Sequence, residues 1–274
     1  MRARARPADV ELRAAGYLDA GSGNVLLQGP AADLSERWRS FLRRVLRPYY
    51  TLVVEPPLFM GERPLAASGY LEHFPQQVLS AAGSRRGSHA RQFVTPAACL
   101  HLYAMLAKRR LGPRGLGVFI EAKCGRHENG RWRFPFRLSG FRMVELVVLG
   151  DAHAVERRRL ALREAVGVAM REVGFDGEWR RASDAFFLGN APGARLLQRL
   201  RGTKQEYRVR LPRGALALAS LNRHEDYFGE AFAIRSGRGI AQSCCAAFGI
   251  ERLTAYGLLR WGARARSWPR EFAG

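Results

Sequence analysis

Residues 121–150 read EAKCGRHENGRWRFPFRLSGFRMVELVVLG, and this stretch decides the fold that the sequence predicts. An apolar run at residues 117–120 leads into it, and a second apolar run fills residues 141–149. Apolar and β-branched runs bounded by turn residues predict a strand, a loop and a strand. Arg126 and Glu128 then lie at the end of a rigid two-stranded platform, where a site can be held in fixed geometry. An ordinary hairpin with a solvated charged turn explains this pattern equally well.

The composition is that of a folded protein. The chain has 274 residues, of which 47% are hydrophobic and 10% aromatic, enough for one large domain. No apolar run approaches the roughly 20 residues that span a bilayer, and the basic start lacks the apolar core of a secretory signal. We therefore expect no membrane partner. Four cysteines in a chain of this length indicate free thiols in a reducing compartment, the cytoplasm, where they can bind metal.

The formal charge of +21 calls for an acidic partner: nucleic acid, a nucleotide or an acidic protein. A compositional explanation competes with this one, and the sequence favours it. Arginine is scattered along the whole chain, and no basic run with interleaved aromatic residues stands out as a nucleic-acid stripe.

The patterns outside the platform predict helices and further strands. Pro96 is a favoured first-turn residue, so a helix should begin there and continue to about Lys108. Asp33 or Ser35 is available as an N-cap for the helix at residues 34–46. The fold class is α+β: a mostly antiparallel sheet flanked by helices, in one domain at residues 9–274 that follows a flexible arm at 1–8. The remaining expected elements are helices at 151–173 and 250–261, and strands at 50–54, 206–211, 215–221, 230–234 and 240–248.

The cysteines offer a candidate metal site. Cys99, Cys124, Cys244 and Cys245 are not in C-x-x-C spacing, so the local signal for zinc is weak. Two thiolates and a carboxylate would nevertheless give three zinc ligands and leave one position open, as in a catalytic site. The spacing alone favours buried, unreactive cysteines over a metal site.

The arginines offer a candidate anion and nucleotide site. Arg126, Arg137 and Arg252 stand at expected strand ends or helix starts, and arginine grips phosphate oxygens through a planar fork. Glu128 could accept a hydrogen bond from an exocyclic amine, and Phe141 could stack under a base. Solvated charges around a hairpin are the alternative, unless the fold brings Arg252 close to the other two.

The run Gly249-Ile250-Glu251-Arg252-Leu253 places a glycine at a strand-to-helix turn and an arginine in the first helical turn. The helix N-terminus already carries partial positive charge, so a cation there suggests a bound anion. An exposed arginine that the dipole barely affects is the alternative reading.

Together these segments resemble the catalytic core of the class II aminoacyl-tRNA synthetases. Residues 124–150 are similar to the second motif of that class, and residues 249–253 resemble its third motif. The strand that ends at Pro56-Pro57 matches the first motif, which lies at a dimer interface in the class, so the resemblance implies a homodimer.

Within that class the chain most resembles the amino acid:[carrier protein] ligases, truncated homologues of the zinc-dependent seryl-tRNA synthetases. The matching runs cover most of the chain and follow in the same order, which makes them more specific together than any one alone. They are Ser68-Gly69-Tyr70-Leu71 with Phe74-Pro75, Pro96-Ala97-Ala98-Cys99 with Tyr103, Cys124 with Arg126-His127-Glu128, Arg137 with Phe141-Arg142-Met143 and Glu145, Ala182-Ser183-Asp184 with Phe186-Phe187, Lys204 with Glu206, Ala219-Ser220 with Asn222, His224, Asp226 and Phe228-Gly229, and Cys245 with Phe248-Gly249.

The resemblance implies a role for part of the cysteine set. Cys99, Glu145 and Cys245 match the zinc ligands of the family, so one Zn²⁺ per chain is expected. The open zinc position of the family binds the amino group of the substrate. Cys245 is preferred to Cys244 because it stands at the matching distance before Phe248-Gly249.

The resemblance also implies roles in binding ATP, which would arrive with Mg²⁺. Arg126 matches the arginine that bridges the substrate carboxylate and the α-phosphate, and Arg252 matches the one at the far end of the nucleotide; both are expected to be catalytic. The other expected site residues are Glu128 and Phe141 at the adenine, Arg137 in the same ATP site, and Ser220 and Asn222 in the amino acid pocket.

The function that follows is ATP-dependent activation of a small amino acid as an aminoacyl-adenylate. The aminoacyl group would then pass to the phosphopantetheine thiol of a carrier protein, whose usual acidity suits a basic surface. Aminoacylation of a tRNA and a non-catalytic paralogue remain as alternatives, although we see no room for a tRNA-binding domain. Gly125, Leu221 and Arg223 depart from the family pattern, which leaves the amino acid specificity open.

Overall fold

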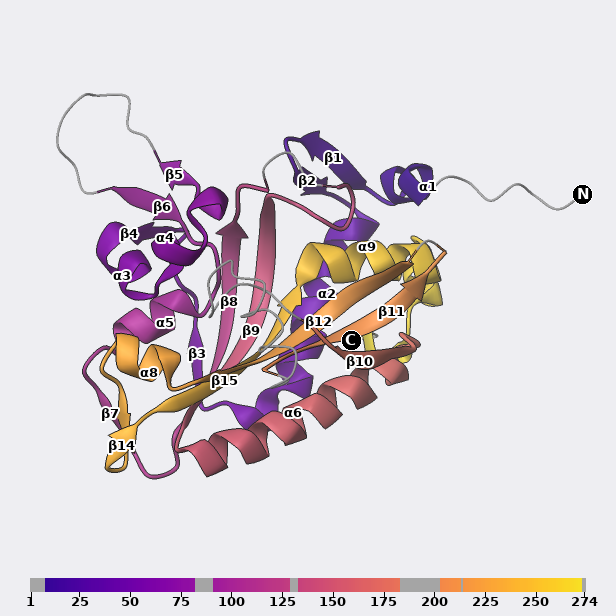
Figure 1. The fold of residues 1–274 in the computed structure, drawn as a ribbon. Coiled ribbons are helices and arrows are strands. Elements are labelled where there is room, and N and C mark those ends of the chain that lie inside the picture. Colours follow the sequence, from indigo (N-terminus) through magenta and orange to yellow (C-terminus); the bar gives the residue numbers. More distant parts are fainter. Residues whose placement is uncertain (1–7, 82–90, 129–132, 183–202, 213, 273–274) are drawn as a thin grey trace, which may run out of the picture.

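The platform forms as the sequence predicts. A computed structural model describes residues 8–81, 91–128, 133–182, 203–212 and 214–272 of the chain. Strand β8 (Leu116–Gly125) pairs antiparallel with β9 (Gly140–Gly150), in register from one end to the other (Figure 1). Alternate side chains along these strands therefore point to opposite faces of the sheet.

The platform belongs to a central sheet that is antiparallel at every pairing except one. The strand order is β10 (Gly177–Arg181), β11 (Lys204–Leu211), β12 (Gly214–Glu225), β15 (Gln242–Gly249), β9, β8 and β3 (Leu52–Val54). Only β3, at the edge, runs parallel to its neighbour β8. The predicted α+β class with a mostly antiparallel sheet is confirmed. Strand β15, late in the chain, lies between β12 and β9.

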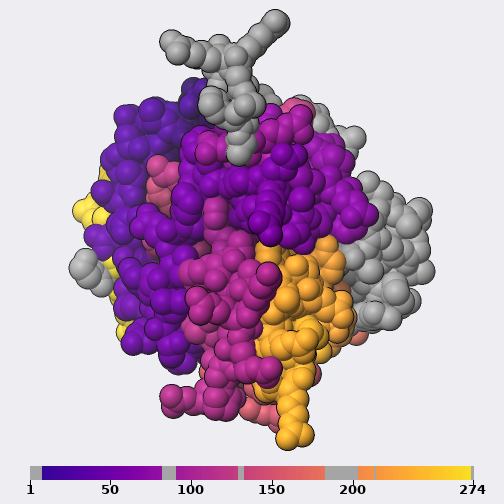
Figure 2. Space-filling view, turned by 90° about the vertical axis from the view of Figure 1, so that its left-hand side faces the viewer, coloured from indigo at the N-terminus to yellow at the C-terminus, as the bar shows by residue number. Residues whose placement is uncertain are grey.

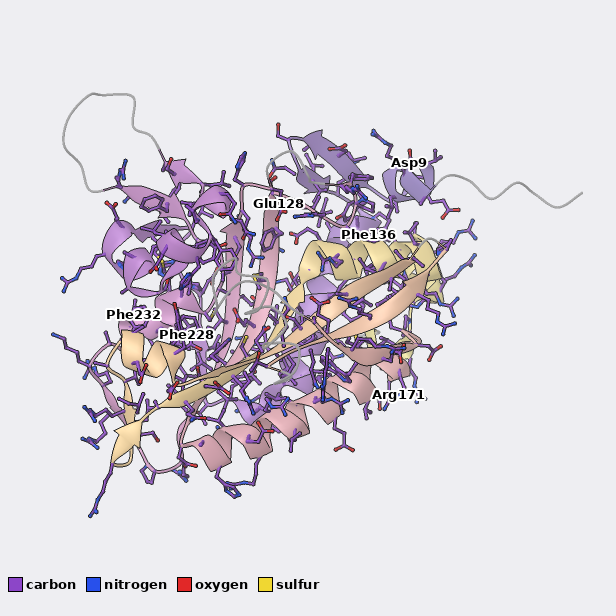
Figure 3. All side chains as sticks on the ribbon, viewed as in Figure 1. Asp9, Glu128, Phe136, Arg171, Phe228 and Phe232 are labelled. Carbon is purple, nitrogen blue, oxygen red and sulfur yellow. The ribbon has the colours of Figure 1, made fainter. Side chains whose placement is uncertain are left out.

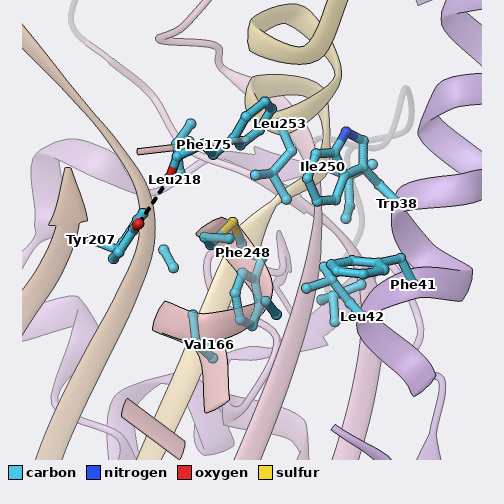
Figure 4. Close-up of a cluster of buried hydrophobic side chains, with 14 of the residues drawn as sticks. Trp38, Phe41, Leu42, Val166, Phe175, Tyr207, Leu218, Phe248, Ile250 and Leu253 are labelled. Atoms are coloured by element: carbon cyan, nitrogen blue, oxygen red, sulfur yellow. Dashed lines mark hydrogen bonds between the residues drawn. The ribbon is translucent and has the colours of Figure 1, made fainter. Parts of the chain in front are cut away.

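Helices cover one face of this sheet. They are α2 (Pro30–Val45), α6 (Ala152–Glu172) and α9 (Ile250–Trp261) (Figure 1). Trp38 of α2 is fully buried, with its ring centroid 5.3 Å from that of Phe175 and 4.7 Å from that of Phe272. Figure 4 shows the apolar cluster around it. This face is the main hydrophobic core.

The predicted helices at 151–173 and 250–261 are confirmed. Asp151 caps α6, since its Oδ1 accepts a hydrogen bond from the backbone N–H of Ala154 at 2.8 Å. The predicted N-cap of α2 was wrong: the helix begins at Pro30, in the first-turn position that proline favours, and Gly29 is its N-cap.

Smaller elements cover part of the opposite face. Tyr103 of α5 (Leu100–Met105) stacks on Phe228 of α8 (Tyr227–Ala231), with ring centroids 4.0 Å apart. In Figure 2 the orange surface near α8 lies against a magenta surface, where β13 (Arg235–Ser236) pairs with β7 (Arg110–Leu111). The neighbouring elements are β4 (Phe59–Gly61), α3 (Glu62–Ala67), α4 (Tyr70–His73), β5 (Ser80–Ala81), β6 (Gln92–Val94) and β14 (Gly239–Ile240).

The remaining described elements lie near the termini or link the others. Helix α1 (Ala8–Ala14) precedes the hairpin of β1 (Tyr17–Gly21) and β2 (Asn24–Leu27). Residues 1–7 of the predicted arm lie outside the described residues, whereas Ala8 already belongs to α1. In the described part of the chain, no helix is both long and apolar enough to cross a membrane. Single 3₁₀ turns occur at Arg47–Tyr49, Pro75–Gln77, Ala265–Ser267 and Arg270–Phe272.

The helix predicted from Pro96 begins only at Leu100. The residues before it are held by the platform. The Thr95 carbonyl accepts a hydrogen bond from the Gly125 N–H at 3.0 Å, and the Pro96 carbonyl accepts one from Arg126 Nε at 2.7 Å. Tertiary contacts thus override the first-turn preference of proline.

No strand forms at residues 230–234: Glu230 and Ala231 belong to helix α8, and the next residues form the turn that follows it. The Glu230 N–H donates to the Asp226 carbonyl at 2.8 Å, which is a helical bond. The preceding strand, predicted to end at Leu221, continues to Glu225 as β12. Short apolar runs do not distinguish helix from strand, and that ambiguity explains the error.

Candidate functional site

The open part of the sheet face forms a cavity of about 330 Å³. Strands β9, β12 and β15 supply its floor, and segments next to the platform supply its walls. Every site residue predicted from the sequence lines this cavity: Cys99, Arg126, Glu128, Arg137, Phe141, Glu145, Ser220, Asn222, Cys245 and Arg252. Residues that are far apart in the chain therefore meet on one surface.

A buried carboxylate lies at the bottom of the cavity between two thiols. Glu145 on β9 is only 2% exposed, and its Oε2 accepts a hydrogen bond from the backbone N–H of Cys99 at 3.0 Å. Burial raises the pKa of Glu145, and hydrogen bonds from the Cys245 and Cys99 thiols partly oppose that shift. The pKa of the Cys99 thiol and that of the Cys245 thiol are raised well above the usual range. Burial is the largest cause, and the charge of Glu145 is the next.

These three side chains fit a zinc ion by their chemistry. Two sulfurs and a carboxylate are ligands that zinc prefers, and three of them leave a fourth position open. In the part of the chain that the structure describes, no group of three His, Cys, Asp or Glu side chains is already arranged as a metal cage. The thiols of Cys99 and Cys245 instead share hydrogen bonds with Glu145.

The other two cysteines lie elsewhere. The Cys244 sulfur points to the opposite face of β15, where it lies 4.0 Å from the Val155 carbonyl oxygen of α6. Cys124 lines a separate cavity of about 640 Å³. Burial is the main cause that raises the pKa of each of these thiols to about 12. Neither thiol reaches the carboxylate cluster through a contact of its own.

The arginines form a cationic wall. Arg126 follows β8, its Nε donates to the Pro96 carbonyl, and its guanidinium carbon lies 5.2 Å from the ring centroid of Phe141. Arg252 of α9 donates from Nε to the Phe136 carbonyl at 3.0 Å and from Nη1 to Ala217 at 2.9 Å. Burial lowers the pKa of Arg252, but an arginine stays charged in a protein. Both arginines line the same cavity as Arg137, an arrangement that the sequence alone left open.

Arg137 and Glu128, which the sequence predicts to contact the nucleotide, form an ion pair with each other. Arg137 donates from Nε and Nη2 to Glu128 Oε2, at 2.6 and 2.5 Å. Glu128 lies near the open ends of β8 and β9 (Figure 3). The Glu128 side chain is 11% exposed and that of Arg137 is 50% exposed, so the arginine is the more exposed partner.

Strand β12 presents polar side chains to the cavity at every second position, as the alternation of a strand requires. Asn222 Nδ2 donates to Ser220 Oγ and to the Cys245 sulfur, each at 3.4 Å. The sequence interpretation gave no role to His224, Lys204 or Glu206, which also line the cavity. The sequence signal that could have indicated His224 is its spacing: it lies two residues after Asn222, so along a strand both side chains point to the same face.

The cavity therefore has two chemically different ends. Arg126 and Arg252 provide positive charge and hydrogen-bond donors that suit phosphate or carboxylate oxygens. The Glu145 cluster is acidic and suits a cation or an amine. A molecule with an anionic part and an amino group would satisfy both ends at once.

The curated relatives are ligases. The chain is 31% identical over 264 residues to amino acid–[acyl-carrier-protein] ligase 2 of Bradyrhizobium diazoefficiens. This match covers 86% of this chain and 78% of the relative. It is 29% identical over 239 residues to ligase 1 of the same organism, covering 78% of this chain and 72% of that protein. No family model matches the chain.

Solved structures share the fold. M. kandleri SerRS in complex with A. aeolicus tRNASec matches 99% of this chain with a TM-score of 0.84 and 20% identity. The prolyl-tRNA synthetase of Giardia lamblia in complex with prolyl-adenylate matches 97%, with a TM-score of 0.79 and 15% identity. This chain spans 60% and 54% of those two chains. At these identities the likeness shows the class II synthetase fold alone.

Proposed function

The chain belongs to the amino acid–[acyl-carrier-protein] ligases, and from that premise we propose that it activates a small amino acid with ATP and loads it on a carrier protein. One observation carries the proposal beyond the family: the residues predicted for ATP, amino acid and metal all line one cavity. Its cationic and acidic ends match the anionic and amino groups of the two substrates.

In the first step, a carboxylate oxygen of the amino acid attacks the α-phosphorus of ATP. The bond from that phosphorus to the oxygen that bridges it to the β-phosphate breaks, and pyrophosphate leaves; Mg²⁺ bound with ATP would neutralise part of its charge. Arg126 would bridge the carboxylate and the α-phosphate, and Arg252 would hold the far phosphates; both arginines line the cavity. These fixed cations stabilise the charge that develops, so positioning and electrostatics supply most of the acceleration.

In the second step, the thiol of the carrier's phosphopantetheine arm attacks the carbonyl carbon of the adenylate. The bond from that carbon to the phosphate oxygen breaks, AMP leaves with its electron pair, the thiol proton is released to solvent, and a thioester remains. The acceptor is a proposal from the relatives' names. The formal charge of +21 supports it, because carrier proteins are usually acidic and charge complementarity speeds association.

We extend the proposal to one Zn²⁺ per chain, held by Cys99, Glu145 and Cys245. When bound, the metal would supply an open position for the α-amine of the substrate. Ser220 and Asn222 lie beside this cluster, because the Asn222 amide reaches both Ser220 and the Cys245 sulfur. They would face the amino acid and keep its side chain small.

We also propose a cytoplasmic homodimer. Leu52 and Val53 of edge strand β3, with the nearby Leu58 and Phe59, are large hydrophobic side chains that stay exposed. A second copy would cover them. All four cysteines are unpaired, as expected in a reducing compartment. Light scattering after size exclusion tests the dimer: a monomer at micromolar concentration would refute it.

Pyrophosphate exchange tests the central proposal. The protein is mixed with ATP, labelled pyrophosphate and a panel of amino acids; exchange with one or a few small amino acids is expected. Loading is then measured on carrier protein with and without its phosphopantetheine arm, and on tRNA. If exchange is observed but only the tRNA is loaded, the acceptor is tRNA and the proposed carrier protein is wrong. Absence of exchange with every amino acid would leave a non-catalytic paralogue.

A further inference from the structure

An irregularity in β12 places a histidine under the proposed metal cluster. Arg223 pairs with Cys244 of β15 and Glu225 pairs with Ser243, so β12 has one extra residue between these pairs. That residue is His224. Glu225 adopts a φ of 54°, in the left-handed region that non-glycine residues rarely enter. Such β-bulges often lie beside active sites, where they re-aim a side chain.

The ring of His224 is buried and held from one side. Its Nδ1 lies 2.9 Å from the Tyr103 hydroxyl and 3.2 Å from the Ser243 hydroxyl. The Tyr103 hydroxyl lies 3.0 Å from that of Ser243. All three residues are less than 6% exposed. The Tyr103 hydroxyl donates to Ser243 Oγ, so the Ser243 hydroxyl is free to donate to Nδ1, and that arrangement leaves the ring proton on Nε2.

The other ring nitrogen faces the cluster. His224 Nε2 lies 3.5 Å from the Cys245 sulfur, within hydrogen-bond range for sulfur. The described contacts of the Glu145 carboxylate are with Cys99 and Cys245, and the histidine touches the cluster through the Cys245 sulfur. His224 therefore contacts the sulfur of a proposed metal ligand.

We propose that His224 is a positioning residue that donates a hydrogen bond from Nε2 to the Cys245 sulfur and fixes its direction toward the metal. The proposal rests on the proposed function, because it assumes that Cys245 binds zinc. Tyr103 and Ser243 hold the ring in the orientation and tautomer that this donation needs. Partners of this kind behind a metal ligand typically contribute about 10- to 100-fold in metal affinity.

Three substitutions of His224 distinguish the loss of the Nε2 hydrogen-bond donor from the loss of the volume of the ring. His224→Gln can place an amide N–H near the position of Nε2, His224→Asn can place one only near Nδ1, and His224→Leu has no donor. Zinc affinity is measured by competition with a chromophoric chelator. We expect affinity to fall about 10- to 100-fold in the Leu and Asn variants and to remain close to wild type in the Gln variant.

Cobalt substitution supplies a second readout. The sulfur-to-cobalt charge-transfer band should shift in the Leu and Asn variants and stay in place in the Gln variant. A Gln variant as weak as the Leu variant, with a spectrum that has lost a nitrogen ligand, would overturn the proposal by making His224 a ligand. Equal affinity in all variants would overturn it as well.

Separate controls test whether the variants fold and whether the wild-type protein binds zinc as the proposed function requires. Thermal unfolding of the metal-free proteins checks that each variant folds. If the Leu variant does not fold, the comparison of the Gln and Asn variants tests the proposal. A wild-type protein that binds no zinc would overturn the metal part of the proposed function and this inference with it. Normal zinc binding by wild type, with no difference between Gln and Asn, would overturn the inference alone.

Discussion

The two faces of the central sheet use the same strands for different purposes. Cys244 and Cys245 are neighbours in sequence, yet one sulfur faces α6 and the other faces the cavity. The two-residue period of a strand is sufficient to separate them. The comparison teaches that residue type says little here, and that the face on which a side chain lies decides whether it packs or takes part in chemistry.

The faces also differ in what stabilises them. The helix-covered face buries an aromatic and aliphatic cluster around Trp38. The cavity face instead carries charged groups whose partners are other site residues, as in the Glu128–Arg137 pair. Changes on the first face should therefore reduce stability, and changes on the second should reduce activity with little effect on stability.

The adjacent cysteines give the sharpest test of this difference. Cys245→Ala should reduce the zinc content from about one ion per chain to near zero and abolish exchange activity. Cys244→Ala removes the same atoms from the packed face and should keep both zinc and activity. Metal analysis by mass spectrometry on the two variants checks this. Equal metal loss in both would break the distinction between the faces.

Trp38→Ala should be the most destabilising change on the packed face. It would remove a fully buried ring and leave a cavity, which costs about 3–5 kcal/mol. Trp38→Phe is the control: within the described residues the indole N–H has no hydrogen-bond partner, so its removal leaves nothing unsatisfied. Urea unfolding measures both variants. Full stability in the Ala variant would contradict the packing we describe.

Arg126→Ala should act on the other face. We expect amino acid-dependent pyrophosphate exchange to fall about 10²- to 10³-fold, because a fixed cation at the reacting phosphate is lost. The unfolding midpoint should hardly change. Arg114→Ala, at an exposed arginine outside the cavity, is the matched control. A variant that loses stability and activity together would mean that Arg126 serves mainly to anchor Pro96.

Asp151→Ala should have the smallest effect. Loss of the cap on α6 should lower the free energy of unfolding by about 1 kcal/mol, and activity per folded molecule should stay unchanged. Asp151→Ser keeps a capping oxygen and should retain most of the stability. Chemical unfolding with a parallel activity assay checks both. An activity loss in the Ala variant would show that the packed face influences the site.

Much of the fold could be predicted because its main elements have strong periodic patterns. The platform and the helices at 151–173 and 250–261 formed as expected. The helix at Pro96 was misplaced because its first carbonyls are bound by Gly125 and Arg126, which no local pattern reveals. The strand expected at 230–234 did not form, because an apolar run as short as residues 231–234 does not distinguish a strand from a helix.

The site was predictable only in part, for a physical reason. Its residues come from segments far apart in the chain, and only the ordered resemblance to a family indicated that they would meet. The two-residue period of β12 indicates that His224 faces the cavity, but not which groups it contacts there. Those contacts depend on the register shift between β12 and β15, which is set by the pairing of two strands and not by the sequence of one.

The central place of β15 has a consequence for how the chain folds as it is synthesised. One half of the sheet, β3, β8 and β9, is made early, and the other half, β10 to β12, follows. Each half keeps an unpaired edge until residues 242–249 arrive and join them, and such edges favour aggregation. The chain therefore closes its sheet with one of its last segments, and that same segment delivers Cys245. The residues that line the cavity therefore come together only once β15 has paired with both of its neighbours.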